Sequence, residues 1–129
     1  MTDGSVLHHV ALCCHEKQSL SVFYEDVLNA KLVKTFLVSP ELFVDIFDKP
    51  GSAEVSVYET DFVCFELFVS DCVGSCCCAH LCFEVADKQV FAEQCEKRSL
   101  PVKWVEKNGR SLLFVSDFSG NLFEIKEKK

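Results

Sequence analysis

The sequence is poor in positive charge and has very little arginine. Its 129 residues include 13 lysines and arginines against 20 aspartates and glutamates, a formal net charge of −7, and the only arginines are Arg98 and Arg110. A chain of this charge lacks the basic surface that nucleic acids require. So few guanidinium groups also give little support for a substrate held by several bidentate arginine contacts. We therefore expect no nucleic-acid partner.

Long hydrophobic runs and targeting signals are missing as well. No stretch approaches the roughly 18 consecutive apolar residues that span a bilayer. The N-terminal "MTDGSVLHH" lacks the basic start and long apolar run of a signal peptide. The composition, 49% hydrophobic and 26% charged, is ordinary for a globular protein. We expect a single cytoplasmic domain with its own core and no membrane partner.

Cysteine is abundant, but its pattern does not fit a disulfide framework. There are nine cysteines, an odd number that includes adjacent pairs, and no C-x-x-C pair that would suggest a zinc knuckle. We expect reduced thiols, several of them small core residues. The run Cys76-Cys77-Cys78 leaves two interpretations open, a linker or a thiol site for soft metals or arsenicals.

A repeat organises the chain. "LHHVALCCHEKQSLSVFYEDVLNAKLV" (7–33) and "AHLCFEVADKQVFAEQCEKRSLPVKWV" (79–105) both have the pattern strand, polar turn, helix, strand. In the helices, Asp87 is a plausible N-cap and the expected packing positions are Leu20, Phe23, Val27 and Leu28, then Val90, Phe91, Gln94 and Cys95. Further strands are predicted in "ELFVDIFD", "AEVSVYET" and "FVCFELFVS" of the first half, and in "SLLFVSD" and "NLFEIKEK" of the second. The prediction is an α+β fold of two βαβββ modules, at about 5–70 and 79–127, joined by a linker at about 71–78.

Side-chain alternation divides the first strand of each module into two faces, because adjacent strand residues point to opposite sides of a sheet. In the first module one face carries His9, Ala11 and Cys13, and the other carries His8, Val10, Leu12 and Cys14. In the second module one face carries His80, Cys82 and Glu84, and the other carries Leu81, Phe83 and Val85. Since the apolar sets belong under the helices, we expect His9 and His80 on the opposite face. His8 is expected on the helix-facing side or at its margin.

The last strand of each module places a glutamate on the same face as that histidine. Glu66 and Glu124 both interrupt apolar series in their strands. Two related modules are therefore expected to bring His9, Glu66, His80 and Glu124 together. Two neutral imidazoles and two carboxylates suit zinc, nickel, cobalt, manganese or iron, with positions left for water or substrate.

These motifs carry a family resemblance over nearly the whole chain. The openings of the two modules, and "SDFSGNLFEI" as a turn followed by a strand bearing glutamate, resemble the vicinal oxygen chelate superfamily of glyoxalases, bleomycin resistance proteins and extradiol dioxygenases. The resemblance implies a cupped, mostly antiparallel, glyoxalase-like sheet around a divalent metal, with His9, Glu66, His80 and Glu124 as ligands. It also implies a homodimer, and leaves open whether the site lies within one chain or between two.

The resemblance further implies a lyase or isomerase of the glyoxalase type, acting on a small substrate whose vicinal oxygens chelate the metal. Glu66 or Glu124 would be the general base, with Glu124 preferred. The alternative is a metal-free small-molecule binding or sequestration protein of the bleomycin-resistance type, which the 12 phenylalanines would suit. Cys13, Cys64 and Cys82 are expected as wall residues on the ligand face. Trp104 is expected either in the cavity wall or at a subunit contact.

Overall fold

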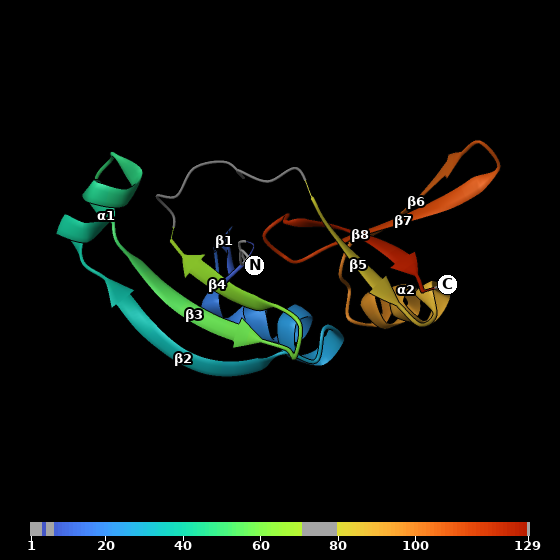
Figure 1. The fold of residues 1–129 in the computed structure, drawn as a ribbon, viewed down its shortest axis with the longest axis horizontal. Helices are drawn as coiled ribbons and strands as arrows, with labels where there is room; N and C mark the ends of the chain where they lie inside the picture. The colour runs from blue at the N-terminus through green and yellow to red at the C-terminus, as the bar shows by residue number, and fades with distance from the viewer. Residues whose placement is uncertain (1–3, 5–6, 71–79, 129) are drawn as a thin grey trace.

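The computed structural model describes Gly4, residues 7–70 and residues 80–128. These residues form two four-stranded sheets, one from each half of the chain (Figure 1). The first has the order β1-β4-β3-β2 and the second the order β5-β8-β7-β6. The strands are β1 Val10–Cys14, β2 Lys31–Val38, β3 Ala53–Glu59, β4 Cys64–Val69, β5 Leu81–Val85, β6 Val102–Lys107, β7 Arg110–Ser116 and β8 Leu122–Glu127.

Both sheets have the same topology. The first strand runs parallel to the last, and the remaining neighbours are antiparallel. Each sheet keeps two open edges, so neither closes into a barrel. The predicted α+β class and the pair of related modules are therefore confirmed.

The helical segment of the first module combines a tighter and a wider winding than that of an α-helix. It consists of the 3₁₀-helix η1 (Lys17–Ser19) and the π-helix η2 (Ser21–Val27). Its buried side chains include the predicted Leu20, Phe23 and Val27, and also Tyr24. A π-helical turn contains an extra residue, which broadens the buried face.

The helix of the second module is α2 (Lys88–Lys97). Asp87 caps it as predicted, because its Oδ1 accepts a hydrogen bond from the Val90 amide at 3.1 Å. Two of the four predicted packing positions are confirmed, since Cys95 is buried and Phe91 packs against the core. Val90 and Gln94 are exposed instead, and Ala92 is buried. In the described part of the chain, no helix combines the length and apolar composition needed to cross a membrane.

The strand predicted for "ELFVDIFD" is wrong, because this segment forms the helix α1 (Pro40–Phe47) between β2 and β3. Ser39 caps its first turn by accepting a hydrogen bond from the Leu42 amide at 3.2 Å, and Pro40 occupies the first helical position. Asp48 ends the helix in the left-handed region, at φ 59°. The capping signals outweigh the short run of large apolar residues that favoured a strand.

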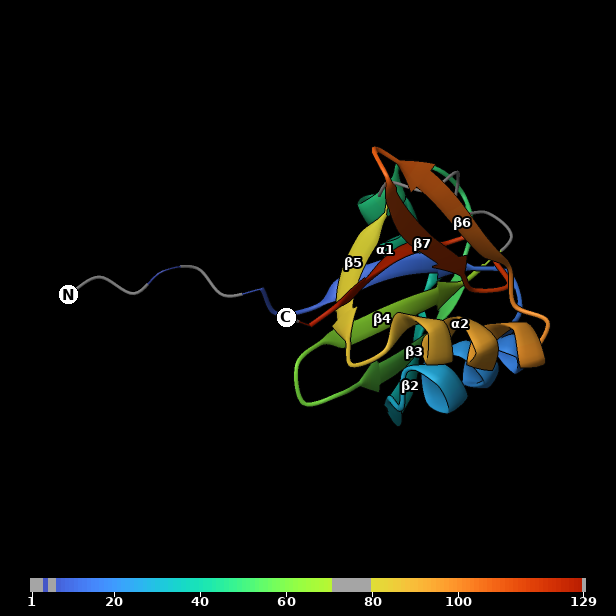
Figure 2. The same ribbon diagram turned by 90° about the vertical axis from the view of Figure 1, so that its right-hand side faces the viewer.

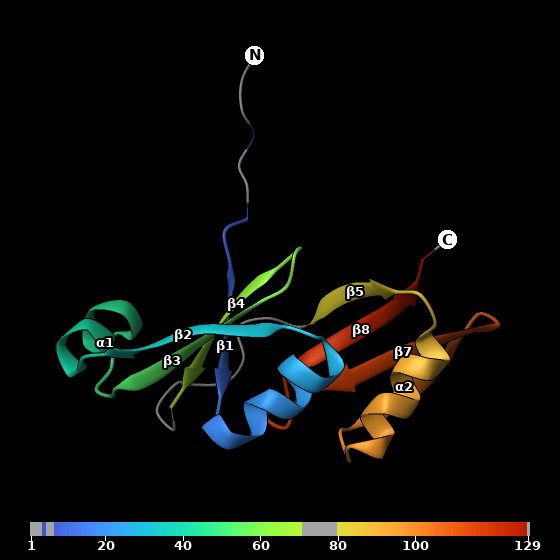
Figure 3. The same ribbon diagram turned by 90° about the horizontal axis from the view of Figure 1, so that it is seen from below.

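The helix-covered faces of both sheets pack into one core. Figures 2 and 3 show η2 and α2 side by side on the same side of the two sheets. The largest core side chains are Phe23, Tyr24, Phe65, Leu67, Leu113, Phe123 and Ile125. A second, smaller cluster lies under α1 on the opposite face of the first sheet and contains Val38, Phe43, Ala53, Val55 and Val57.

A buried turn joins the two modules at Asp117. One carboxylate oxygen accepts hydrogen bonds from the Tyr24 hydroxyl and the Asn121 side-chain amide, both at 2.8 Å. The other accepts from the backbone amides of Ser119 and Asn121, both at 2.9 Å. Asn121 also donates to the carbonyl of Cys13 at 2.9 Å. The "DFSGN" segment therefore ties the second module to β1 and η2 of the first.

Candidate functional site

The first module brings His9 and Glu66 together on the face away from η2, which is the face that also carries α1. In the sheet register Glu66 of β4 lies between Ala11 of β1 and Val57 of β3, while its neighbours Phe65 and Leu67 are buried in the shared core. Strand alternation therefore directs Glu66 to the opposite side. His9 Nε2 lies 3.5 Å from Glu66 Oε1.

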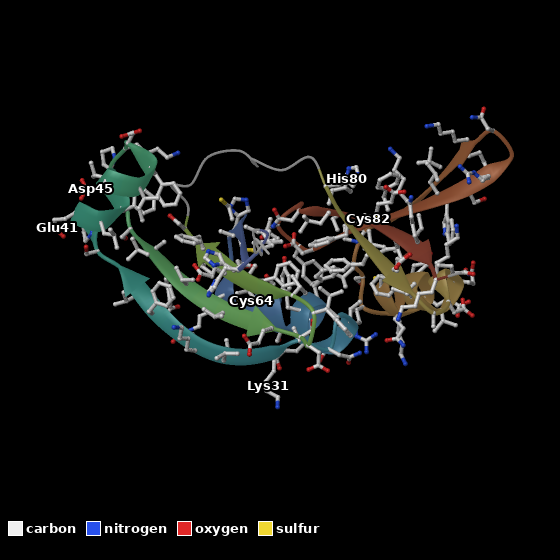
Figure 4. The ribbon with its side chains drawn as sticks, in the orientation of Figure 1. Lys31, Glu41, Asp45, Cys64, His80 and Cys82 are labelled. Carbon is white, nitrogen blue, oxygen red and sulfur yellow. The ribbon has the colours of Figure 1, made fainter. Side chains whose placement is uncertain are left out.

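The second module repeats this arrangement with His80 and Glu124. Glu124 of β8 lies in register between Cys82 of β5 and Phe114 of β7. His80 Nε2 lies 3.3 Å from Glu124 Oε1, and the His80 ring makes an edge contact with Phe114 at a centroid distance of 5.8 Å. Figure 4 shows His80 just before β5 and Cys82 within it. The two histidine–glutamate pairs thus occupy equivalent register positions in the two sheets.

Each pair fits two ligands of one divalent ion. With zinc–ligand bonds of about 2.1 Å and a tetrahedral angle, the two ligand atoms lie about 3.4 Å apart. The separations of 3.5 Å and 3.3 Å match this spacing. An imidazole nitrogen and a carboxylate oxygen also suit several first-row metals.

The structure does not bring all four candidate ligands together in one copy. Among the described residues, no group of three or more histidine, cysteine, aspartate or glutamate side chains lies close enough to hold a metal. The modules instead meet through their helix-covered faces, which leaves the two pairs on separate surfaces of the chain. A single copy therefore presents two half sites.

The thiols beside these carboxylates are held in the protonated form. The pKa of Cys64 is raised first by burial and then by the charges of Glu59 and Glu66. The pKa of Cys82 is raised first by burial and then by the charge of Glu124. Thiols rather than thiolates suit the predicted wall role, because the thiolate is the nucleophile and the metal ligand. The run Cys76-Cys77-Cys78 lies outside the described residues.

His8 is not covered by the helices but lies beside His9. His8 is exposed, and its Nδ1 lies 2.9 Å from Nδ1 of His9, with the rings nearly perpendicular at 84°. Both residues precede Val10, the first residue of β1, so no ladder hydrogen bonds impose strand alternation on them. The adjacency of two histidines just before a strand was the available signal.

Trp104 lies on the helix-covered face of the second sheet and not on the face of Glu124. Its register partner is Leu113, a core residue, and directly opposed strand residues point to the same side. Lys88 Nζ, from α2, lies 5.7 Å from the centroid of its ring. Trp104 is therefore no part of the candidate site within one chain.

A cavity of about 290 Å³ reaches His9 from the turn between β3 and β4. Its lining includes His8, His9, Glu59, Asp61 and Cys64. A larger cavity of about 820 Å³ lies between the modules, lined by residues such as Val27, Val63, Phe83 and Phe91, and touches none of the four candidate ligands. The cavity beside His9 is therefore the one relevant to the half site of the first module.

Comparison with known proteins identifies structural neighbours. No protein family and no curated protein matches the sequence. A mutant of the fosfomycin resistance protein FosX from Listeria monocytogenes, solved with Mn(II) and 1S,2S-dihydroxypropylphosphonic acid, superposes with a TM-score of 0.72 at 15% identity, covering 98% of this chain and 95% of that chain.

Two further neighbours share the fold. A glyoxalase family protein from Enterococcus faecalis gives a TM-score of 0.69 at 18% identity, covering 93% of this chain and 95% of its own. FosX from Mesorhizobium loti gives a TM-score of 0.69 at 15% identity, covering 100% of this chain and 94% of its own. The chain has the fold of these fosfomycin resistance and glyoxalase family proteins, which is the glyoxalase-like fold that its sequence motifs predicted.

Proposed function

We propose that this protein is a divalent-metal-dependent lyase or isomerase of the glyoxalase type, acting on a small substrate with vicinal oxygens. The observation that carries the proposal is the pair of histidine–glutamate sets at equivalent register positions, with nitrogen–oxygen separations of 3.5 Å and 3.3 Å. The neighbours solved with Mn(II) add support at the level of the fold.

The proposed site is completed by a second copy of the chain. His9 and Glu66 of one protomer would face His80 and Glu124 of its partner, because one copy keeps these pairs apart. A twofold dimer built in this way contains two equivalent sites, as closed symmetry requires. The homodimer is thus part of the proposal, because each half site supplies only two of the four candidate ligands.

The chemistry divides between the metal and the carboxylates. When bound, a divalent ion supplies Lewis acidity that stabilises an oxyanion on the chelated substrate. Glu124 would leave the metal to act as the preferred general base, taking a proton from the carbon beside the substrate carbonyl. Its side chain keeps 16% exposure against 21% for Glu66, so it is the more sheltered from water. His9 and His80, directly before the first residues of β1 and β5, would bind the metal through their imidazole nitrogens.

Metal titration of the purified, metal-free protein tests the proposal. We expect micromolar or tighter binding of Mn²⁺, Co²⁺ or Zn²⁺ at one ion per chain, measured by calorimetry. His9→Ala and His80→Ala should each weaken binding strongly. His15→Ala is the matched control, since His15 lies beyond the other end of β1. Absence of binding by the wild-type protein would refute the metal-dependent function.

Solvent exchange tests the reaction class. Small 2-hydroxy carbonyl compounds incubated in D₂O with the metal-loaded protein should exchange the hydrogen next to the carbonyl, followed by proton NMR. Glu124→Gln should lower the rate by at least about 100-fold, the range expected for a general base. If Glu66→Gln shows this loss and Glu124→Gln does not, the general base is Glu66.

The second candidate function is metal-free binding of a planar small molecule. It is favoured by the apolar surface beside the first half site, where Phe47 of α1 contacts Phe68 of β4 at a centroid distance of 5.7 Å. Binding of an aromatic ligand in the presence of a chelator, with no loss in His9→Ala, would support this function over the metal-dependent one.

A further inference from the structure

The contact between His8 and His9 has a defined chemical consequence. Their Nδ1 atoms lie 2.9 Å apart, a hydrogen-bond distance. Between two neutral imidazoles, such a bond requires one nitrogen to carry the proton and the other to offer its lone pair. Two arrangements are therefore available, and they differ in whether Nε2 of His9 carries a proton or a free lone pair.

In one arrangement His8 donates and His9 accepts. The proton of His9 then sits on Nε2, the atom that faces Glu66 Oε1 at 3.5 Å. A protonated Nε2 has no lone pair for a metal. In the other arrangement His9 donates through Nδ1–H, its Nε2 lone pair points toward Glu66, and the proton of His8 sits on its own Nε2. Because His8 is exposed, that proton can be hydrated at little cost.

We propose that His8 is a positioning residue, which accepts the Nδ1–H hydrogen bond of His9 and thereby holds Nε2 of His9 ready to bind a metal ion. This inference rests on the proposed function. A ligating histidine commonly donates its second ring proton to a neighbouring acceptor, which fixes both its tautomer and its ring orientation. His8 supplies that acceptor from the adjacent position in the chain.

The arrangement belongs to the first module alone. The sequence has Ala79 at the position before His80, so no imidazole can act there in the same way. The His80 ring instead meets the edge of Phe114. Substitution of His8 should therefore affect only the half site of His9 and Glu66.

Zinc affinity of matched variants tests the role of His8. His8→Ala removes the acceptor and should weaken zinc binding about tenfold, the lower end of the range for such outer partners because water can replace an exposed group. His8→Asn places an amide oxygen near the position of Nδ1 and should restore affinity to within about twofold of wild type. His8→Gln, whose oxygen reaches further along the side chain, should resemble His8→Ala. His15→Ala should leave the affinity unchanged.

The tautomers give a readout that a purely structural role would not move. In zinc-loaded protein with ¹⁵N-labelled histidine, long-range ¹H–¹⁵N spectra should show His9 protonated at Nδ1 and His8 protonated at Nε2. Equal zinc affinity in wild type and His8→Ala, or zinc bound through Nδ1 of His9, would overturn this inference alone. No zinc binding by the wild type would overturn the proposed function and this inference with it.

Discussion

At the scale of single residues, Asp117 is the polar group on which the junction between the modules depends. It is buried, and its two oxygens accept hydrogen bonds from Tyr24, Ser119 and Asn121. Burial is also the main reason that the pKa of Tyr24 is raised well above its ordinary value. The tyrosine therefore stays protonated and remains a hydrogen-bond donor.

Replacing Asp117 should destabilise the fold severely. Asp117→Ala leaves the Tyr24 hydroxyl and the Asn121 side chain without their buried acceptor, and we expect a loss of about 2–4 kcal/mol in the free energy of unfolding. Urea denaturation followed by fluorescence measures it. Asp87→Ala, which removes only a helix cap, should cost about 1 kcal/mol. A loss no larger for Asp117→Ala than for Asp87→Ala would show that the buried turn does not hold the modules together.

The buried thiols predict how stability changes at alkaline pH. Burial is the main cause that raises the pKa of Cys14 to about 12, from an ordinary 9.0, and burial raises the pKa of Cys95 to about 11. Above pH 9 the unfolded chain releases these protons while the folded protein retains them, so stability falls as the pH rises. Between pH 8 and pH 10, Cys14 alone should cost about 1.4 kcal/mol.

Urea denaturation at the two pH values measures this loss. Cys14→Ala lowers the starting stability but should also make the decrease between pH 8 and pH 10 smaller by about 1.4 kcal/mol. Parallel decreases in the wild type and in Cys14→Ala would mean that the thiol ionises freely in the folded protein.

Residue positions that depend on sheet register could be predicted from the sequence, and His9 and His80, one residue before β1 and β5, still follow the alternation of those strands. Glu66 and Glu124 lie inside strands, where the alternation of side chains fixes their face as soon as the flanking apolar residues are assigned to the core. His8 lies before β1, where no partner strand fixes the backbone. The adjacency of the two histidines was the signal in the sequence, but the geometry of their contact is given only by the three-dimensional structure.

At the scale of elements, α1 is the feature by which the first module departs from the second. It buries Phe43 against the first sheet and leaves Leu42, Val44 and Ile46 partly exposed. Its sequence is a short run of large apolar residues that also suits a strand, and only Ser39 and Pro40 signal a helix start. Local pattern alone could not decide between these structures, because a run of eight residues is short for either periodicity.

Paired substitutions in α1 test which side of the helix packs on the first sheet. Phe43→Ala should cost about 3–4 kcal/mol in the free energy of unfolding, since it empties a buried site in the smaller core cluster. Leu42→Ala, at a position that is 47% exposed, should change stability by less than about 0.5 kcal/mol. Urea denaturation gives both values. Equal costs at the two positions would contradict the burial of Phe43 between α1 and the first sheet.

At the scale of the whole molecule, the central fact is that the two modules are equivalent but joined through their helix-covered faces. The shared core, the Asp117 turn and the packing of α2 against η2 fix this arrangement in each chain. The sequence repeat predicted the modules, but not the way they meet. We expected the two modules to bring four ligands together. Among the described residues, each module instead forms its own histidine–glutamate pair, and the two pairs lie apart.

Mixing two inactive variants tests whether the proposed site spans two protomers. His9→Ala/Glu66→Ala destroys the first-module half site, and His80→Ala/Glu124→Ala destroys the second-module half site. Either homodimer has two broken sites. In a heterodimer, the intact first module of one chain meets the intact second module of the other, so one complete site is restored.

Random exchange of protomers makes about half of the dimers heterodimers, and the mixture should therefore regain about a quarter of the wild-type metal sites, because a twofold dimer has two. The measurement is bound zinc after mild unfolding, refolding and gel filtration of the mixture, with each variant treated alone as its control. The restored sites should vanish when the two variants are mixed only after refolding, provided that the dimers do not exchange. A site built within one chain would recover no zinc in any mixture, because every chain would carry a broken half.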